Sequence, residues 1–182
     1  MRIISSLVMT ICLMLTAIPT LANDENLPDT LIIEKVQAVK GAKAAMKIDF
    51  VNDQELAALT IPIGIVGDAY EIDSVSFVGS RVEYLKMRPV TISEGRKEVV
   101  FGAICMTEDY IPVGRGLMAT LYLSPAKSSK SDFCVVDTVT IGPASVLFTK
   151  KNSASFIPEF QSGLVSNKPV SGKEDTGKKT TE

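Results

Sequence analysis

The sequence predicts an all-β protein, a single jelly-roll β-sandwich of about nine strands. Short stretches in which every second residue is apolar recur between residues 30 and 165, and this alternation is typical of strands with one buried face. Turn-forming residues separate the stretches at intervals of about 8 to 12 residues, a spacing common in β-sandwiches. No segment shows a convincing amphipathic helical period.

The sandwich is expected at residues 29–165, between two segments that do not belong to it. Residues 1–22 carry one charge, at Arg2, then an apolar run that ends in small residues suited to cleavage after Ala22, which predicts a secretory signal peptide. A membrane anchor is the alternative, but polar residues dilute the run and no basic cluster follows it. Residues 23–28 form a polar lead-in. Residues 166–182 are rich in charged and small residues and are predicted to be a disordered tail.

Charge excludes two classes of partner. Loss of Arg2 with the signal peptide leaves 18 basic and 21 acidic residues, so the net charge changes from −2 to −3. Such a chain has no basic footprint for nucleic acid or for anionic lipid. We therefore expect a secreted, extracellular or periplasmic protein that binds no nucleic acid and leaves the membrane after signal cleavage.

The first half of the domain is predicted from alternation and turns. A strand at 30–39 ends before Gly41, and a strand at 44–51 alternates strictly. The strand at 59–65 contains Pro62, which cannot donate to a ladder, so the strand must be an edge there or carry a bulge. In the strand at 72–77 the apolar positions change parity between its first and fourth residues, which predicts a bulge.

The second half is less regular. The strands are expected at 85–92 with Pro89 inside, at 99–106, at 117–123, at 133–141, at 146–148 and at 156–165 with Pro158 near its start. The segment 99–106 is apolar at both parities, so it is covered on both faces or flanked by a partner strand. The connection 107–115 is the least regular one in the domain.

The residue types argue against an enzyme. The chain has no histidine, which removes Ser–His and Cys–His nucleophiles and the usual zinc sites. Ser124 and Lys127 match a serine acyl-enzyme pattern, but Pro125 lies between them where that pattern needs a helix. The loop carboxylates are simpler as turn residues, and no calcium-loop spacing is present. We expect no catalytic residue, metal or cofactor.

Two cysteines remain after signal cleavage, Cys105 and Cys134, both in apolar strand-like segments. Export to an oxidising compartment would allow them to form a disulfide. The alternative is two separate buried thiols that act as small hydrophobic residues. The sequence leaves both possibilities open, because it does not show whether the two α-carbons lie within about 7 Å.

Candidate binding residues lie in or beside loops. Tyr70, Tyr84 and Tyr110 could form a small aromatic platform for a sugar ring, although the chain has no tryptophan for a larger one. Arg115 lies at the end of the irregular connection 107–115, and we include it as a fourth candidate. The motif that contains it, Gly114-Arg115-Gly116, is expected only to turn the chain, because no helix follows it.

Several segments together resemble the cohesin-like domains of secreted bacterial proteins. They are NDQELAALTIPIGI, IDSVSFVGSRVE, IPVGRGLMATLYL, VVDTVTI and ASFIPEF, followed by Gly163-Leu164-Val165. The resemblance implies a nine-stranded jelly roll in a superfamily shared with carbohydrate-binding modules. It also implies a non-catalytic module that binds a protein, in cohesins a dockerin, through one sheet face. A carbohydrate-binding module linked to polysaccharide breakdown and a structural envelope subunit are the alternatives.

Overall fold

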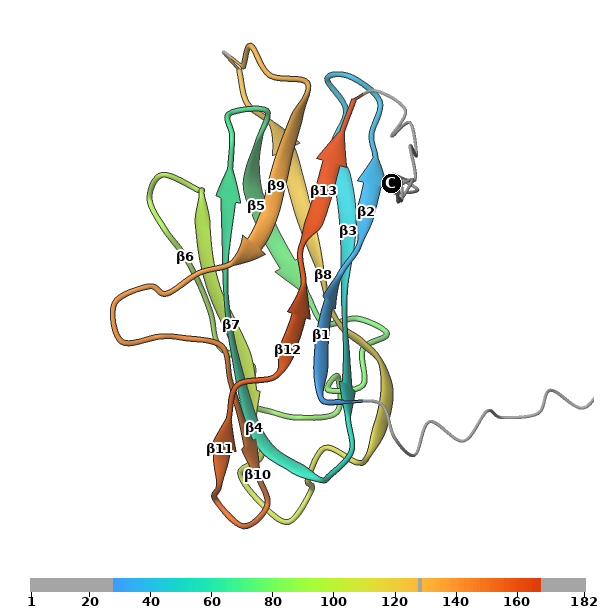
Figure 1. Ribbon diagram of the computed structural model, residues 1–182, viewed down its shortest axis with the longest axis vertical. Coiled ribbons are helices and arrows are strands. Elements are labelled where there is room, and N and C mark those ends of the chain that lie inside the picture. The colour runs from blue at the N-terminus through green and yellow to red at the C-terminus, as the bar shows by residue number, and fades with distance from the viewer. Residues whose placement is uncertain (1–27, 128, 168–182) are drawn as a thin grey trace, which may run out of the picture.

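The computed structural model describes residues 28–127 and 129–167, and these residues form strands and loops without a helix. The predicted signal peptide, residues 23–27 of the lead-in and residues 168–182 of the tail lie outside them. Figure 1 shows the strands arranged in two layers that run along the long axis of the molecule. The strands are β1 (Thr30–Ile33), β2 (Lys35–Gln37), β3 (Ala44–Asn52), β4 (Leu56–Val66), β5 (Tyr70–Ser76), β6 (Val90–Ile92), β7 (Glu98–Ile104), β8 (Gly114–Pro125), β9 (Phe133–Thr138), β10 (Leu147–Lys150), β11 (Ser155–Phe156), β12 (Glu159–Gln161) and β13 (Gly163–Ser166).

The two layers are mostly antiparallel sheets. The first, which we call the β8 sheet, has the order β12-β1-β3-β8-β5. The second, the β4 sheet, has the order β11-β10-β4-β9-β13-β2, with β7 on the other side of β4 and β6 beyond β7. The predicted all-β sandwich is therefore confirmed. Its core is a layer of alternating side chains between the sheets, for which Ile61 of β4 and Leu121 of β8, both fully buried, are typical.

Pro62 illustrates how β4 accommodates a residue without an N–H. β4 is central, because β7 covers one side along Ala58–Gly64. On the other side the pairing with β10 ends at Thr60, and the pairing with β9 begins at Ile63. Pro62 lies in the interval between these two partners, where only its carbonyl is used, by the N–H of Val139. The sequence predicted that the strand is an edge at Pro62 or carries a bulge there. β4 as a whole is a central strand, but at Pro62 one of its sides has no paired strand, so it is an edge at that position.

The bulge predicted in the fourth strand is confirmed. In β5, Ile72 pairs with Leu123 and Ser74 pairs with Tyr122, so Asp73 is the extra residue. Its carboxylate accepts hydrogen bonds from Lys43 Nζ at 2.7 Å and from Arg96 at 2.6 Å. The bulge therefore links the β8 sheet to the turn between β6 and β7.

The first and last predicted strands are each divided, which corrects the sequence analysis. β1 and β12 pair in parallel in the β8 sheet, while β2 and β13 pair in parallel in the β4 sheet. The chain changes sheet at Glu34 and again at Ser162, so these divisions explain part of the excess over nine strands. Both crossings lie side by side, because a Cβ at Gly163 would collide with Ile33 and would lie 2.7 Å from the Glu34 carbonyl oxygen.

Three smaller expectations also change. Of the predicted strand 85–92, only β6 and one bridge at Met87 form, because Val82 and Leu85 enter the core through a turn instead. The strand predicted at 133–141 ends at Thr138, and residues 139–146 form a flap in which Ile141 and Ala144 exchange two backbone hydrogen bonds. Ser166 belongs to β13 and is buried, so the ordered domain extends beyond residue 165 into the predicted tail.

Candidate interaction surface

Tyr70 is not a surface residue, which corrects its assignment as a binding residue. Its ring is fully buried at the start of β5, and its hydroxyl donates a 2.6 Å hydrogen bond to Asn167 Oδ1. Burial raises the pKa of this phenol. Alternation explains the position, because Tyr70 has the same parity as the buried Ile72. This hydrogen bond thus connects Asn167, the residue that follows β13, to a side chain of the core.

Tyr84 and Tyr110 are brought together, as a shared platform requires. The Tyr84 hydroxyl donates a 2.8 Å hydrogen bond to the Tyr110 carbonyl oxygen, and Lys151 Nζ lies 4.6 Å from the centre of the Tyr110 ring. Tyr84 is 52% exposed and lines a hollow of about 140 Å³. The remaining lining residues are Leu85, Lys86, Ile104, Met106, Thr107 and Asp109.

Arg115 is exposed on strand β8. The glycines on either side of it leave space for the side chain of another residue, Arg81. The Arg81 side chain crosses this segment: a Cβ at Gly116 would lie 2.8 Å from Arg81 Cδ, and one at Gly114 would lie 3.5 Å from its Nη2. Both glycines also have positive φ. The Gly114-Arg115-Gly116 motif therefore makes room for an arginine as well as shaping the backbone.

Both cysteines are free, so the disulfide does not form. The Cys134 thiol is buried and the Cys105 thiol is half-buried. Cys105 donates toward the Leu56 carbonyl at one end of β4, whereas Cys134 lies next to Val135, which pairs with Val66 at the other end. With a rise of about 3.3 Å per residue, the length of β4 separates them by roughly 30 Å. No disulfide can span that distance. Burial raises the pKa of Cys134 to about 11, so this thiol is protonated at neutral pH.

The outward faces of the two sheets differ in how their charged residues are distributed. On the β8 sheet, Lys47, Glu71 and Arg115 alternate with core residues, so that face carries charges of both signs. On the β4 sheet, eight outward residues of β4, β7 and β10 form paired rows, and we call them the outer β4 face. They are Ala58, Thr60, Pro62, Val100, Gly102, Ile104, Leu147 and Thr149. None of these eight is charged, although Glu98 of β7 and Asp137 of β9, which both pair with Gly64, place charged groups beside them on the same side of the sheet.

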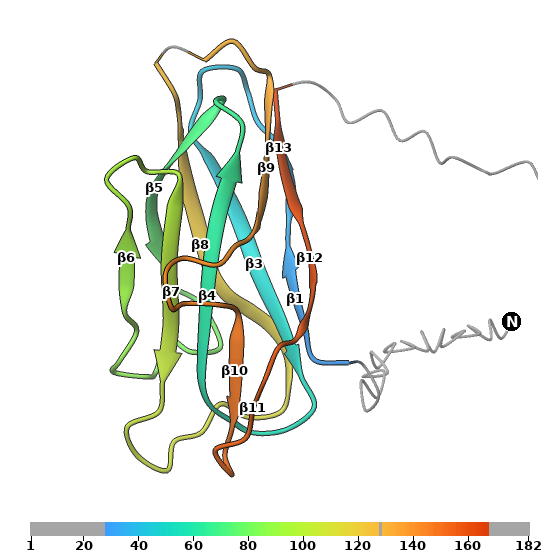
Figure 2. The ribbon, with the colours of Figure 1, turned by 60° about the vertical axis from the view of Figure 1, so that its left-hand side comes forward.

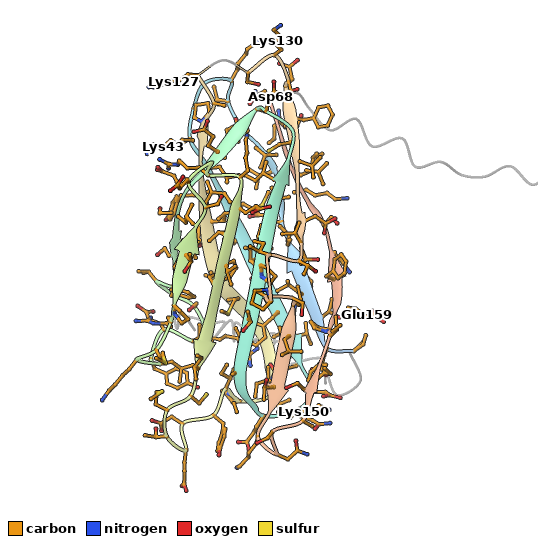
Figure 3. The ribbon with its side chains drawn as sticks, turned by 90° about the vertical axis from the view of Figure 1, so that its left-hand side faces the viewer. Lys43, Asp68, Lys127, Lys130, Lys150 and Glu159 are labelled. Atoms are coloured by element: carbon orange, nitrogen blue, oxygen red, sulfur yellow. The ribbon has the colours of Figure 1, made fainter. Side chains whose placement is uncertain are left out.

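Charged groups lie at the ends of this face. Figure 3 shows Asp68, Lys127 and Lys130 at one end of the sandwich and Lys150 at the other. The flap borders the outer β4 face before that first end is reached, because a Cβ at Gly64 would lie 2.7 Å from Val139 Cγ1, and Figure 2 shows the β9–β10 connection crossing over β4 part-way along the sandwich. The uncharged area therefore lies between the flap and the loops near Tyr84.

The outer β4 face has a hollow of about 80 Å³ at Gly102. Its rim includes Thr60, Thr91, Val100 and Ile104, and it is apolar apart from the threonine hydroxyls. A Cβ at Gly102 would collide with the Leu59 carbonyl oxygen, so only glycine fits there. Sequence reasoning missed this site, although Gly102 inside an otherwise apolar strand was the available signal.

Ile104 connects this hollow to the one beside Tyr84, since it lines both. It is 37% exposed and pairs with Met87, which is 44% exposed. β7 thus carries two neighbouring shallow hollows on the outward side of the sheet. Such a surface suits contact with another macromolecule better than enclosure of a small molecule.

Within residues 28–127 and 129–167, no three His, Cys, Asp or Glu side chains are grouped so that they could hold a metal ion. The same residues contain no helix that is long and apolar enough to cross a membrane.

Fold and surface together define a two-sheet β-sandwich in which part of the β4 sheet, the outer β4 face, is an uncharged patch. No family model matches the sequence, and no curated protein matches it. The chain nevertheless has a cohesin-like fold, as the sequence resemblance predicted. It matches many solved cohesin structures at TM-scores of about 0.64.

Three of these structures illustrate the similarity. The sixth cohesin of scaffoldin B from Acetivibrio cellulolyticus, solved in complex with a Cel5 dockerin mutant, has a TM-score of 0.66 and 14% identity, over 78% of this chain and 100% of that one. The seventh ScaB type I cohesin of Pseudobacteroides cellulosolvens has a TM-score of 0.64 and 17% identity, over 76% and 90%. A non-cellulosomal cohesin of the archaeon Archaeoglobus fulgidus has a TM-score of 0.62 and 11% identity, over 77% and 91%.

Proposed function

We propose that this chain is a non-catalytic module that binds a partner protein through the outer β4 face. The observation that carries the proposal is an uncharged patch of the β4 sheet that contains a hollow at Gly102. The centres of protein interfaces are depleted of charged residues, and their binding energy is concentrated where one side chain fills a pocket. The charged β8 sheet offers neither property.

The fold supports the same role. The cohesin of Acetivibrio cellulolyticus was solved with a dockerin bound. We infer by analogy that the partner of this chain is a dockerin-like protein module, although sequence identities of 11–17% carry over only the fold. The proposal includes export from the cytoplasm, because residues 1–22 have the pattern of a cleavable signal peptide.

Affinity capture with matched variants tests the proposal. The wild-type chain, Ile104→Glu and Ala45→Glu are immobilised and exposed to secreted proteins of the organism that makes the chain. Ala45 is exposed on β3 in the other sheet, so its substitution adds the same charge away from the outer β4 face. A partner should be retained by the wild type and by Ala45→Glu and lost by Ile104→Glu, because an unpaired carboxylate buried in an interface costs about 3 kcal/mol, roughly a hundredfold in Kd.

Two outcomes would contradict the proposal. One is that the wild-type chain captures no partner. The other is that both variants bind a captured partner as the wild type does. Self-association of the wild type in analytical ultracentrifugation, abolished by Ile104→Glu, would instead indicate a structural subunit that packs against its own copies.

Carbohydrate binding is the second candidate, and the hollow beside Tyr84 favours it. A half-exposed ring with its hydroxyl already fixed by Tyr110 can stack on a sugar, while Lys86, Thr107 and Asp109 can bond its hydroxyls. Affinity gels that contain soluble polysaccharides separate the two candidates. Retardation that Tyr84→Ala abolishes would favour the sugar, and unchanged migration across the panel would exclude it.

A further inference from the structure

Two methionines lie beside Ile104, at the end of the outer β4 face nearest Tyr84. Met87 pairs with Ile104 across the β7 edge, with the Ile104 N–H donating to the Met87 carbonyl at 3.0 Å. Met106 follows Ile104 by two residues and lines the same hollow as Tyr84. Their side chains are 44% and 67% exposed. Both thioethers are therefore open to solvent beside the residue that joins the two hollows.

The other methionines of the described part of the chain differ sharply. Met46 and Met118 are fully buried between the two sheets. Buried thioethers in a packed core are shielded from dissolved oxidants, whereas exposed ones are not. Exposure thus divides the four described methionines into two pairs, and the exposed pair lies at the proposed binding surface.

We propose that Met87 and Met106 are sites of reversible sulfoxidation by peroxides and that this modification weakens partner binding. A lone pair of the thioether sulfur attacks one oxygen of hydrogen peroxide, the O–O bond breaks and an S–O bond forms. The attacked oxygen gives up its proton, and the departing hydroxide takes up a proton and leaves as water. Sulfur is oxidised by two electrons, and peroxide is reduced by two. The effect on binding rests on the proposed function, but the modification itself does not.

The consequence for binding follows from polarity. A sulfoxide replaces a flexible apolar side chain with a polar group that accepts hydrogen bonds. If a partner covers this part of the face, each sulfoxide must be buried without an arranged donor. That penalty corresponds to an affinity about tenfold lower. Reduction by methionine sulfoxide reductases would restore the thioether.

Peptide-resolved mass spectrometry during hydrogen peroxide treatment of the folded chain tests the modification. Oxygen should appear at Met87 and Met106 before any appears at Met46 or Met118, and it should appear at all four at similar rates once the chain is unfolded in urea. Met1, Met9 and Met14 lie outside the described residues and are followed in their own peptides. Oxidation of Met46 or Met118 as fast as Met87 in the folded chain would overturn the inference.

A partner-independent measurement tests the change of the surface. Retention of the peroxide-treated chain on a hydrophobic-interaction column should fall, and it should not fall for the double variant Met87→Leu/Met106→Leu, which keeps apolar side chains of similar size. Once a partner has been captured, treated wild type should bind about tenfold more weakly, and the treated double variant should bind unchanged. Sulfoxides at both sites without loss of retention or affinity would refute the switch and leave the proposed function intact.

Discussion

Arg81 joins three parts of the fold through one side chain. Its guanidinium donates 2.9 Å hydrogen bonds to Asn52 Oδ1 and to the Gly114 carbonyl, donates a third to the Pro112 carbonyl, and lies 4.3 Å from the centre of the Phe50 ring. Asn52 is itself almost fully buried and donates to the Pro112 carbonyl. The side chain thus satisfies polar groups where the β3–β4 turn meets the start of β8, and it packs against the core.

We predict that Arg81→Lys lowers the free energy of unfolding by about 1 to 3 kcal/mol, because an ammonium group cannot reproduce the planar fork or the stacking on Phe50. Chemical denaturation monitored by circular dichroism measures the change. Arg115→Lys, at an exposed position of β8, is the control and should stay within about 0.5 kcal/mol of the wild type. Equal effects of the two substitutions would contradict this account of Arg81.

At the scale of elements, the divided strands explain how the two sheets are joined along one side. β1 and β12 run parallel in the β8 sheet, and their continuations β2 and β13 run parallel in the β4 sheet. The two segments pass from one sheet to the other side by side, where Gly163 approaches Ile33 and Glu34. Because Ile33 and Glu34 leave no room for a side chain at position 163, that position requires glycine for steric reasons, although its φ is not positive.

Gly163→Ala should therefore destabilise the domain by about 1 to 3 kcal/mol, the usual cost of forcing an extra methyl group into a packed site. Thermal unfolding followed by circular dichroism is a sufficient measurement. Gly95→Ala provides the matched control, because nothing lies within 4 Å of a Cβ built there. An unchanged melting temperature for Gly163→Ala would mean that the crossing can open without cost.

At the scale of the whole molecule, Asp73 holds one end of the sandwich together. Its carboxylate, at the β5 bulge, bonds Lys43 before β3 and Arg96 in the β6–β7 turn, and Arg96 also donates to the Ile72 carbonyl. The hydrogen bond from Lys43 and then that from Arg96 hold the pKa of Asp73 below its usual value of 3.8. A contact network thus spans both sheets at a site that is open to solvent.

The depressed pKa of Asp73 sets the sign of a pH effect. A carboxyl whose pKa is lower in the folded state stabilises the fold above its unfolded pKa of about 3.9 and loses that contribution as pH falls through the folded pKa. We expect the free energy of unfolding of Asp73→Asn to fall less steeply than that of the wild type below about pH 5. Urea denaturation at a series of pH values measures both slopes. Parallel slopes would show that the ion network is absent in solution.

The proposed binding surface, the outer β4 face, also belongs to the scale of the molecule. Its rows come from β4, β7 and β10, whose residues lie far apart in the sequence. Alternation predicted which residues of β4 face outward, but not which strands lie beside them. Tyr84 and Tyr110 could be identified as candidates because their place in loops is a local feature of the sequence. The hollow at Gly102 could not, because it forms only where β4, β6 and β7 lie side by side.

The sequence by itself determined the β class, the approximate positions of most strands, the bulge between Ile72 and Val75, and the cohesin-like resemblance. These follow from local patterns, because the period of two and the turn residues are written in neighbouring positions. It could not determine the sheet change at Gly163, the separation of Cys105 from Cys134, or the burial of Tyr70. Each of these depends on which distant segment packs opposite, and only the tertiary structure decides that.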